Sequence, residues 1–234
     1  MNPNDPNVVL LEMVAKHLGV ELREKLVFVG GAVAGLLITD PAMPSIRPTD
    51  DVDLVVHAAV LEDYHAVEEE LTACGFVHDM SIDAPICRWR IGSVAVDVMP
   101  TIETVLGFSN RWYQLATETP RLVMLPSGVE IRLVSAPVFI ATKLEAFVGR
   151  GNNDYLFSHD MGDLIAVIDG RDALLEECKG IDEALKIYLR EWFSRLLADR
   201  FFIDAIPGHL PGDNANQARF PELETKLRAI AQLE

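Results

Sequence analysis

The sequence has little cysteine, few basic residues and no long apolar run. Its three cysteines, Cys74, Cys87 and Cys178, are odd in number and lack the spacing of a metal site. They indicate reduced thiols in a cytoplasmic protein rather than a disulfide framework. No apolar stretch approaches the length of a membrane span, and the N-terminus has neither a basic start nor a cleavable apolar segment. We therefore expect a cytoplasmic protein without membrane contact.

Basic residues are outnumbered, with 20 Lys and Arg against 36 Asp and Glu, which gives a formal net charge of −16. Such a surface repels nucleic acid unless basic residues are gathered locally. A broad nucleic-acid groove is therefore disfavoured, whereas contact with a single RNA end stays open because salt screens distant charges. Half of the residues are apolar, which is enough for one large domain or two small ones.

The hydrophobic pattern predicts an α/β (α+β) protein in two parts. Residues 1–134 should form a mixed sheet with flanking helices, and residues 135–234 a mostly helical region. Strands are expected at residues 26–29, 51–56, 87–91, 94–99, 121–125 and 130–134. Helices are expected at residues 7–18, 32–38, 61–73, 101–105, 136–147, 159–168, 173–178, 181–205 and 221–233.

Three aspartates are the most informative feature of the chain. Asp51 and Asp53 alternate in an apolar strand, so both side chains leave the same face, whereas Asp50 points to the other face. Asp97 lies in a second strand-like run flanked by valines. Crowded carboxylates repel one another, and a divalent cation is the simplest partner that makes such a cluster favourable. The alternative for each is a solvated position at the edge of a strand.

A glycine pair precedes the acidic strand. Gly30 and Gly31 end an apolar run, and taken alone they are an ordinary turn from strand to helix. Beside the aspartates, their amides are expected to meet nucleotide phosphates, with help from the helix dipole. Arg47 and Thr49 lie just before Asp51, where a phosphate contact and a solvated loop are both open.

These segments together resemble the DNA-polymerase-beta-like nucleotidyltransferase superfamily. The resemblance is carried by Phe28-Val-Gly-Gly31, by Arg47-Pro-Thr-Asp-Asp-Val-Asp-Leu54 and by Val96-Asp97-Val98. Within the superfamily the chain looks most like the bacterial AbiEii-type toxin and related uncharacterised nucleotidyltransferases. That closer likeness extends to Lys143-Leu-Glu-Ala-Phe-Val-Gly-Arg150 and Ser158-His-Asp-Met-Gly-Asp163, and it covers residues 25–170.

The resemblance implies roles for the residues in these segments. Asp51 and Asp53 would hold the metal of the nucleotide, and Asp97 would complete the site or act as a base near the acceptor. Lys143 would offset triphosphate charge with help from Arg150, the alternative being a surface lysine whose stem lies along the core.

An acidic pair, Asp160 and Asp163, would support the site by fixing Lys143 or Arg150. The alternative for Asp160 is a favourable charge in the first turn of a helix capped by Ser158.

The implied protein is a Mg²⁺- or Mn²⁺-dependent nucleotidyltransferase. Residues 1–134 would be its catalytic core, and residues 135–234 would complete the active site. It would transfer NMP from an NTP to a hydroxyl of RNA, protein or a small molecule and release pyrophosphate. A toxin-like role would imply an antitoxin partner.

Two other functions stay open. One is a catalytically inactive nucleotide-binding module that regulates or partners another protein. The other is a metal-dependent phosphohydrolase, which is disfavoured because only His57 lies near the acidic strand. His209 and Arg219 flank a loop in the C-terminal region, where a polar surface and a substrate contact are both open.

Overall fold

The computed structural model describes residues 1–234 as two compact units. Unit 1 consists of Met1–Val33 and Arg47–Ser135, and unit 2 consists of Ala34–Ile46 and Ala136–Glu234. The chain therefore leaves unit 1 for a short excursion and returns to it before the helical region begins. The division expected from the sequence assigned that excursion to the first part, whereas the structure groups it with the helices.

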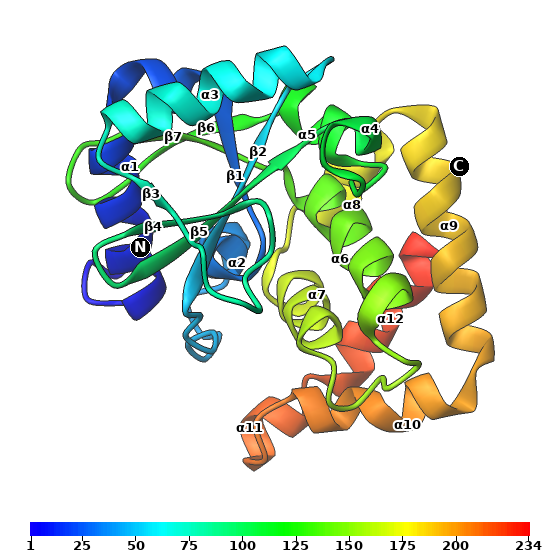
Figure 1. Cartoon of the computed structure of the whole chain (residues 1–234). Helices are drawn as coiled ribbons and strands as arrows, with labels where there is room; N and C mark the ends of the chain where they lie inside the picture. Colours follow the sequence, from blue (N-terminus) through cyan, green and yellow to red (C-terminus); the bar gives the residue numbers. More distant parts are fainter. The chain divides into compact units, whose positions relative to one another are not determined.

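Unit 1 is built on a seven-stranded mixed sheet (Figure 1). The strands lie in the order β3-β4-β5-β2-β1-β7-β6. Two pairs are parallel, β2 with β5 and β1 with β7, and the other pairs are antiparallel. This architecture confirms the mixed α/β class expected from the sequence. The strands are β1 Leu26–Val29, β2 Asp51–Val56, β3 Val77–His78, β4 Arg88–Ile91, β5 Val94–Pro100, β6 Arg121–Met124 and β7 Glu130–Leu133.

Most side chains of the central strands β1 and β2 are apolar. All four residues of β1 are buried, as are four of the six in β2, which suits strands that are covered on both faces. A two-residue turn connects β4 to β5, and Gly92 in that turn has φ of 59°, a value that favours glycine. The short strand β3 was not expected from the sequence, because two residues carry too little periodicity to predict one.

Helices flank this sheet. They are α1 Pro6–Lys25, the short 3₁₀ turn η1 Gly31–Val33, α3 Leu61–Ala73, α4 Glu103–Leu106 and α5 Tyr113–Glu118. We expected the first helix to end at Gly19, and Gly19 does leave the helical conformation, with φ of 69° and ψ of −174°, so α1 consists of two helical segments joined at a kink. Leu22 continues the buried face beyond the kink, and Arg23 Nη1 donates to the main-chain oxygen of Ala15, so helix resumes as far as Lys25.

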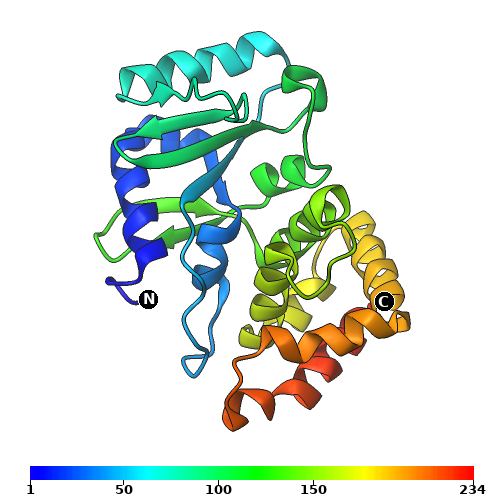
Figure 2. The same cartoon turned by 60° about the horizontal axis from the view of Figure 1, so that its bottom comes forward.

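Unit 2 is helical (Figure 2). Helix α7 packs against α6, α10 and α12, and α9 packs against α6, α10 and α12. The single helix expected over residues 181–205 is two helices, because extended backbone at Asp199 interrupts it and the Asp199 carboxylate caps the second. The helices are α2 Ala34–Leu37, α6 Ala136–Arg150, α7 His159–Gly170, α8 Leu174–Lys179, α9 Glu183–Ala198, α10 Arg200–His209, α11 Asn214–Gln217 and α12 Phe220–Ile230.

The excursion Ala34–Ile46 is attached to the end of α7. The amides of Thr39 and Asp40 both donate to the main-chain oxygen of Gly170, at 2.9 and 3.0 Å. A Cβ at Gly170 would lie only 2.8 Å from side-chain atoms of Ile38 and Met43, so a larger residue would separate the two segments. These local contacts explain why this stretch belongs to the helical unit. No helix of the chain is both long enough and apolar enough to cross a membrane.

Candidate functional site

Two of the three aspartates face each other on adjacent parallel strands of unit 1. The register of β2 and β5 pairs Asp53 with Asp97, and Asp51 lies two residues earlier on the same face of β2. Val52 and Leu54 take the opposite face and are fully buried. Adjacent strands are about 4.8 Å apart, so the carboxylates of Asp53 and Asp97 start from neighbouring positions.

The Asp53 carboxylate lies against the backbone of Gly30. An ideal Cβ built on Gly30 would be 1.8 Å from Asp53 Oδ2, so no side chain fits at this position without a rearrangement. Gly30 also has φ of 73°, in the left-handed region. Both observations explain why a glycine follows the last residue of β1. Gly31 is the first residue of the buried turn η1.

Arg88 contacts both Asp51 and Asp97. No sequence motif indicated that this arginine belongs to the site. Its Nε and Nη2 donate to Asp97 Oδ1 and Oδ2, both at 2.7 Å, and Nη2 also reaches Asp51 Oδ2 at 3.2 Å. The hydrogen bonds that Arg88 donates to Asp97 raise the pKa of its guanidinium, and partial burial opposes them only in part. The guanidinium therefore stays charged at any physiological pH.

No group of three or more His, Cys, Asp or Glu side chains is gathered closely enough to hold a metal ion. The three aspartates expected as ligands share one face, but a guanidinium lies between Asp51 and Asp97. Their Oδ2 atoms are 3.2 and 2.7 Å from one Arg88 nitrogen, so they are at most about 6 Å apart. That separation leaves both oxygens within reach of one cation after modest rotation, because a divalent ion contacts oxygen at about 2.0–2.6 Å.

The segment before β2 is held by a buried asparagine that was not expected from the sequence. Asn7, which is 3% exposed, donates from Nδ2 to the main-chain oxygen of Arg47, and its Oδ1 accepts from the Thr49 amide at 2.9 Å. Thr49 Oγ1 also donates to the main-chain oxygen of Asp51. These bonds use the backbone of Arg47 and leave its side chain exposed.

Cys87 lies beside this face but is no nucleophile. Burial, followed by the charge of Asp97, raises the pKa of its thiol to about 12. A thiol that is almost never ionised at neutral pH is unreactive. Transfer through a covalent cysteine intermediate is therefore disfavoured.

Lys143 occupies a buried ionic cluster in unit 2. Its Nζ donates to Asp163 Oδ2 at 2.7 Å and to Asp160 Oδ1 at 3.1 Å, and its side chain is 7% exposed. The resemblance implied that this ammonium lies at a triphosphate and that the two aspartates fix it or Arg150, and both aspartates contact it here. The reason is tertiary: Asp160 and Asp163 are one turn apart on α7 and face α6 together.

Arg150 completes this cluster from the end of α6. Its Nε and Nη2 both donate to the Asp160 carboxylate at 2.9 Å, so Asp160 contacts Arg150 and Lys143 at once. Burial raises the pKa of Asp160, but the bonds and charges of Arg150 and Lys143 outweigh burial and hold that pKa below its usual value. The Arg150 side chain remains 72% exposed, which distinguishes it from the enclosed Lys143.

His209 and Arg219 make contacts within unit 2. Arg219 donates to Asp169 and to Asp40, both at 2.8 Å, and so connects the excursion to α7. His209 Nε2 lies 2.7 Å from the main-chain oxygen of Tyr155. Burial lowers the pKa of His209, and the bond to Tyr155 opposes that effect in part. Both side chains therefore have a structural role in this unit.

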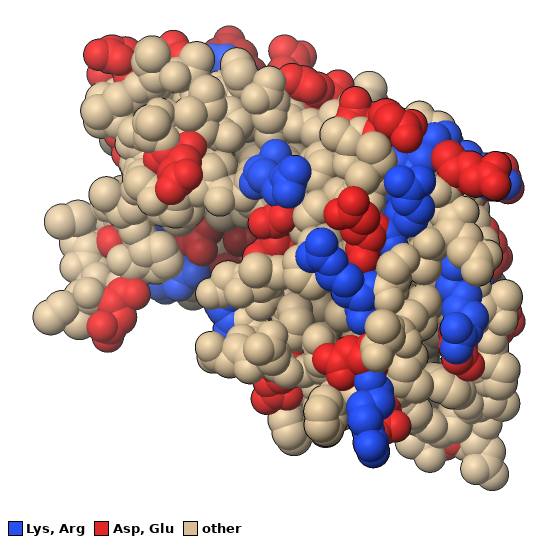
Figure 3. All heavy atoms as spheres, turned by 90° about the vertical axis from the view of Figure 1, so that its right-hand side faces the viewer, with Lys and Arg blue, Asp and Glu red and all other residues tan.

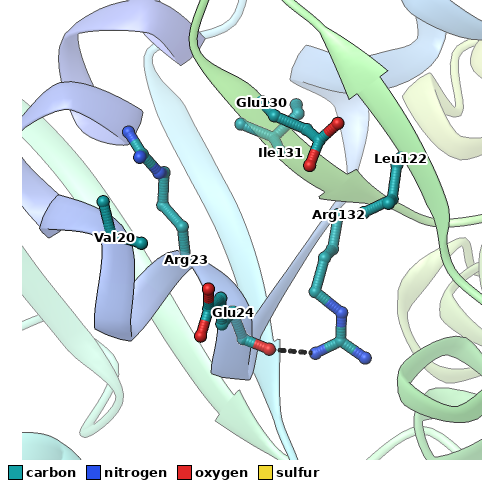
Figure 4. A pocket seen from close by; sticks show the side chains of 7 residues that line it. All are labelled: Val20, Arg23, Glu24, Leu122, Glu130, Ile131 and Arg132. Carbon is teal, nitrogen blue, oxygen red and sulfur yellow. Dashed lines mark hydrogen bonds between the residues drawn. The ribbon is translucent and has the colours of Figure 1, made fainter.

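A pocket of about 290 Å³ lies in unit 1 between α1, β6 and β7 (Figure 4). Arg132 in its wall donates from Nη1 and Nη2 to the main-chain oxygens of Glu24 and Thr117. The wall mixes both charges with apolar groups and contains none of the residues expected at the site. Its lining is Val20, Arg23, Glu24, Leu122, Glu130, Ile131 and Arg132.

The charge of the surface is mixed on the face drawn in Figure 3. Lys and Arg side chains are interspersed there with Asp and Glu, without a continuous basic area. The formal net charge of −16 disfavours binding of a long nucleic acid.

No family model matches the chain, and no curated protein matches it. One solved structure that is similar is JHP933 from Helicobacter pylori, with 11% sequence identity and a TM-score of 0.46. The alignment covers 96% of this chain and 92% of that one. Function therefore has to be inferred from the residues of this chain.

Proposed function

We propose that the chain is a magnesium-dependent nucleotidyltransferase that transfers NMP from a nucleoside triphosphate to an acceptor hydroxyl. The observation that supports this most is the pairing of Asp53 with Asp97 on parallel strands, with Asp51 on the same face and Gly30 beneath the Asp53 carboxylate. Like charges on paired strands are destabilising. A divalent cation shared by the carboxylates would offset that cost.

The proposed ligands are Asp51, Asp53 and Asp97. Mg²⁺ and Mn²⁺ favour carboxylate oxygens, and two of these side chains already converge on one cationic nitrogen of Arg88. When bound, the ion would neutralise phosphate charge and lower the pKa of the acceptor hydroxyl. This donor set fits such an ion once Arg88 releases Asp97.

The glycine turn would receive the triphosphate. Gly30 presents backbone without a side chain beside Asp53, so amides of the Gly30-Gly31 turn would approach phosphate oxygens there. In the proposed reaction the acceptor oxygen bonds to the α-phosphorus while the bond to pyrophosphate breaks. The acceptor proton passes to the Asp97 carboxylate or to solvent. Thr49, held by Asn7, would keep the approach to β2 rigid.

We assign Lys143 a structural part in this proposal. Its ion pairs with Asp160 and Asp163 stabilise the packing of α6 against α7, and its ammonium is enclosed. Arg150, whose side chain is 72% exposed, is the more accessible cation of this cluster.

The acceptor would be an RNA end, a protein or a small molecule. The acidic composition disfavours a long nucleic acid as the acceptor. A toxin-like role, with an antitoxin as partner, is part of the proposal only through the resemblance of the sequence.

The second candidate is a nucleotide-binding module without turnover. Arg88 favours it, because a guanidinium that already binds both oxygens of Asp97 satisfies the acidic face without a metal ion. Such a module would bind a nucleotide but release no pyrophosphate.

Labelled transfer distinguishes the two candidates. The protein is incubated with each α-labelled NTP, Mg²⁺ and a cell extract, and the labelled species identifies nucleotide and acceptor. Asp53→Asn should abolish labelling with unfolding behaviour unchanged, whereas Asp50→Asn, at an exposed position just before the strand, should label normally. Nucleotide binding without any labelling would favour the module, and full labelling by Asp53→Asn would refute the proposed site.

A further inference from the structure

Arg88 and Asp97 form a bidentate ion pair across a hairpin. The register of β4 and β5 sets them directly opposite each other, and the fork of the guanidinium takes both carboxylate oxygens at 2.7 Å. The Asp97 side chain is 11% exposed and that of Arg88 26%, so solvent weakens this pair less than it weakens a surface pair.

The same guanidinium also reaches Asp51. One nitrogen, Nη2, lies between Asp97 Oδ2 and Asp51 Oδ2, at 2.7 and 3.2 Å. A divalent ion shared by these two oxygens would need the space that this nitrogen fills. It would also experience repulsion from a positive charge within hydrogen-bonding distance of both ligands. The ion and the guanidinium are therefore mutually exclusive at this position.

We propose that Arg88 serves as the internal cation of the metal-free protein and is displaced when a divalent ion binds, so that Arg88 sets the metal affinity of the site. The inference rests on the proposed function, since it concerns the same carboxylates. Without metal, Arg88 stabilises the acidic face. With metal, the ion binds the oxygens of Asp97 and Asp51, and the guanidinium, whose side chain is already 26% exposed, moves further into solvent.

The same strand offers a matched control. Arg90 lies two residues further along β4, where it donates to Asp79 Oδ2 and to the main-chain oxygen of Ser93 rather than to the aspartates of the site. Arg90→Met removes the same charge and the same volume from the same face of the strand. A general effect of net charge on metal binding would appear in both arginine variants, whereas displacement predicts an effect of Arg88 alone.

The test is a Mn²⁺ titration of the full chain, with free Mn²⁺ followed by electron paramagnetic resonance. Arg88→Met should bind Mn²⁺ roughly tenfold to a hundredfold more tightly than the unaltered chain, because binding no longer breaks charge-assisted hydrogen bonds. Arg90→Met should bind like the unaltered chain. Metal-free Arg88→Met should unfold at a lower temperature, and Mn²⁺ should raise its unfolding temperature more than that of the unaltered chain.

The other outcomes of the Mn²⁺ titration separate the displacement by metal from the proposed function. If the unaltered chain binds Mn²⁺ and Arg88→Met binds it equally or more weakly, the displacement is refuted while the proposed function stands. If neither binds Mn²⁺, with or without an NTP, both proposals fail. Should Arg88→Met not fold, Arg88→Lys keeps the charge without the fork, and a tighter Mn²⁺ affinity in that variant is still required.

Discussion

Replacing Gly30 by alanine tests the close approach of the Asp53 carboxylate to the glycine turn. The backbone of Gly30 has φ of 73°, which costs a non-glycine residue about 1–2 kcal/mol. The added Cβ would also lie 1.8 Å from Asp53 Oδ2 and 2.6 Å from Asp53 Cβ, so the strand or the turn has to move. Overpacking of this kind costs roughly 1–3 kcal/mol, and we expect a total loss of roughly 2–5 kcal/mol.

Urea unfolding of Gly30→Ala measures this loss, and two glycines of the same unit supply controls. Gly92 and Gly128 have φ of 59° and 82°, with no atom within 4 Å of an added Cβ. Gly92→Ala and Gly128→Ala therefore carry the backbone cost without the collision. If Gly30→Ala loses no more stability than these controls, Asp53 does not lie against the turn and the geometry of the site is wrong.

Three further predictions concern unit 2 and are measured by denaturant unfolding. Lys143→Met leaves two buried carboxylates without their ammonium and should lower the free energy of unfolding by roughly 3–5 kcal/mol. Arg150→Met, at a side chain 72% exposed, should lower it by at most about 1 kcal/mol, and equal losses would contradict the assignment of Lys143 to the core. Arg150 and Lys143 hold the pKa of Asp160 below its usual value, so its contribution to stability is complete above the pKa of the unfolded chain and is lost as the pH falls through the lower folded pKa. Asp160→Asn should therefore flatten the fall in stability below about pH 4, and an unchanged slope would refute this. Arg219→Met should cost roughly 2–4 kcal/mol because the Asp169 side chain is 2% exposed, and a loss near zero would contradict the pairing.

Local patterns were enough to predict most of the sheet. Alternation in Asp51–Val56 set both aspartates on one face, and the Gly92-Ser93 turn predicted the hairpin. The same turn also indicates the position of Arg88, which we did not predict. A two-residue hairpin places Arg88 opposite Asp97, so the register alone identifies the arginine partner of the third aspartate.

Other features depend on contacts between distant segments and could not be predicted from local pattern. The resemblance implied a phosphate ligand at Lys143, and no acidic residue lies three or four positions from it on its helix to indicate an ion pair. The resemblance alone indicated Asp160 and Asp163 as its partners, because they come from a helix that only packing brings opposite. The assignment of Ala34–Ile46 to unit 2 has the same origin, since Gly170 accepts its amides.

The interruption of the first helix at Gly19 was predicted, but the second helical segment that follows it was not. Glycine often ends a helix because it tolerates a positive φ, and Gly19 has φ of 69° with an extended ψ of −174°. The apolar face resumes at Leu22, however, and its burial outweighs the cost of starting a second helical segment. A glycine at one position does not indicate whether the residues of the next turn are buried, so the second segment could not be predicted from Gly19.

The proposed function depends on Asp51, Asp53 and Asp97 holding a divalent ion for a nucleoside triphosphate. Calorimetric titration with α,β-methylene nucleotide analogues, which cannot be cleaved at that bond, measures this binding without turnover. We predict that at least one analogue binds in the presence of Mg²⁺, that EDTA abolishes binding, and that Asp53→Asn loses it while Asp50→Asn retains it. Equal affinity in EDTA, or in Asp53→Asn, would contradict the metal site and with it the proposed reaction.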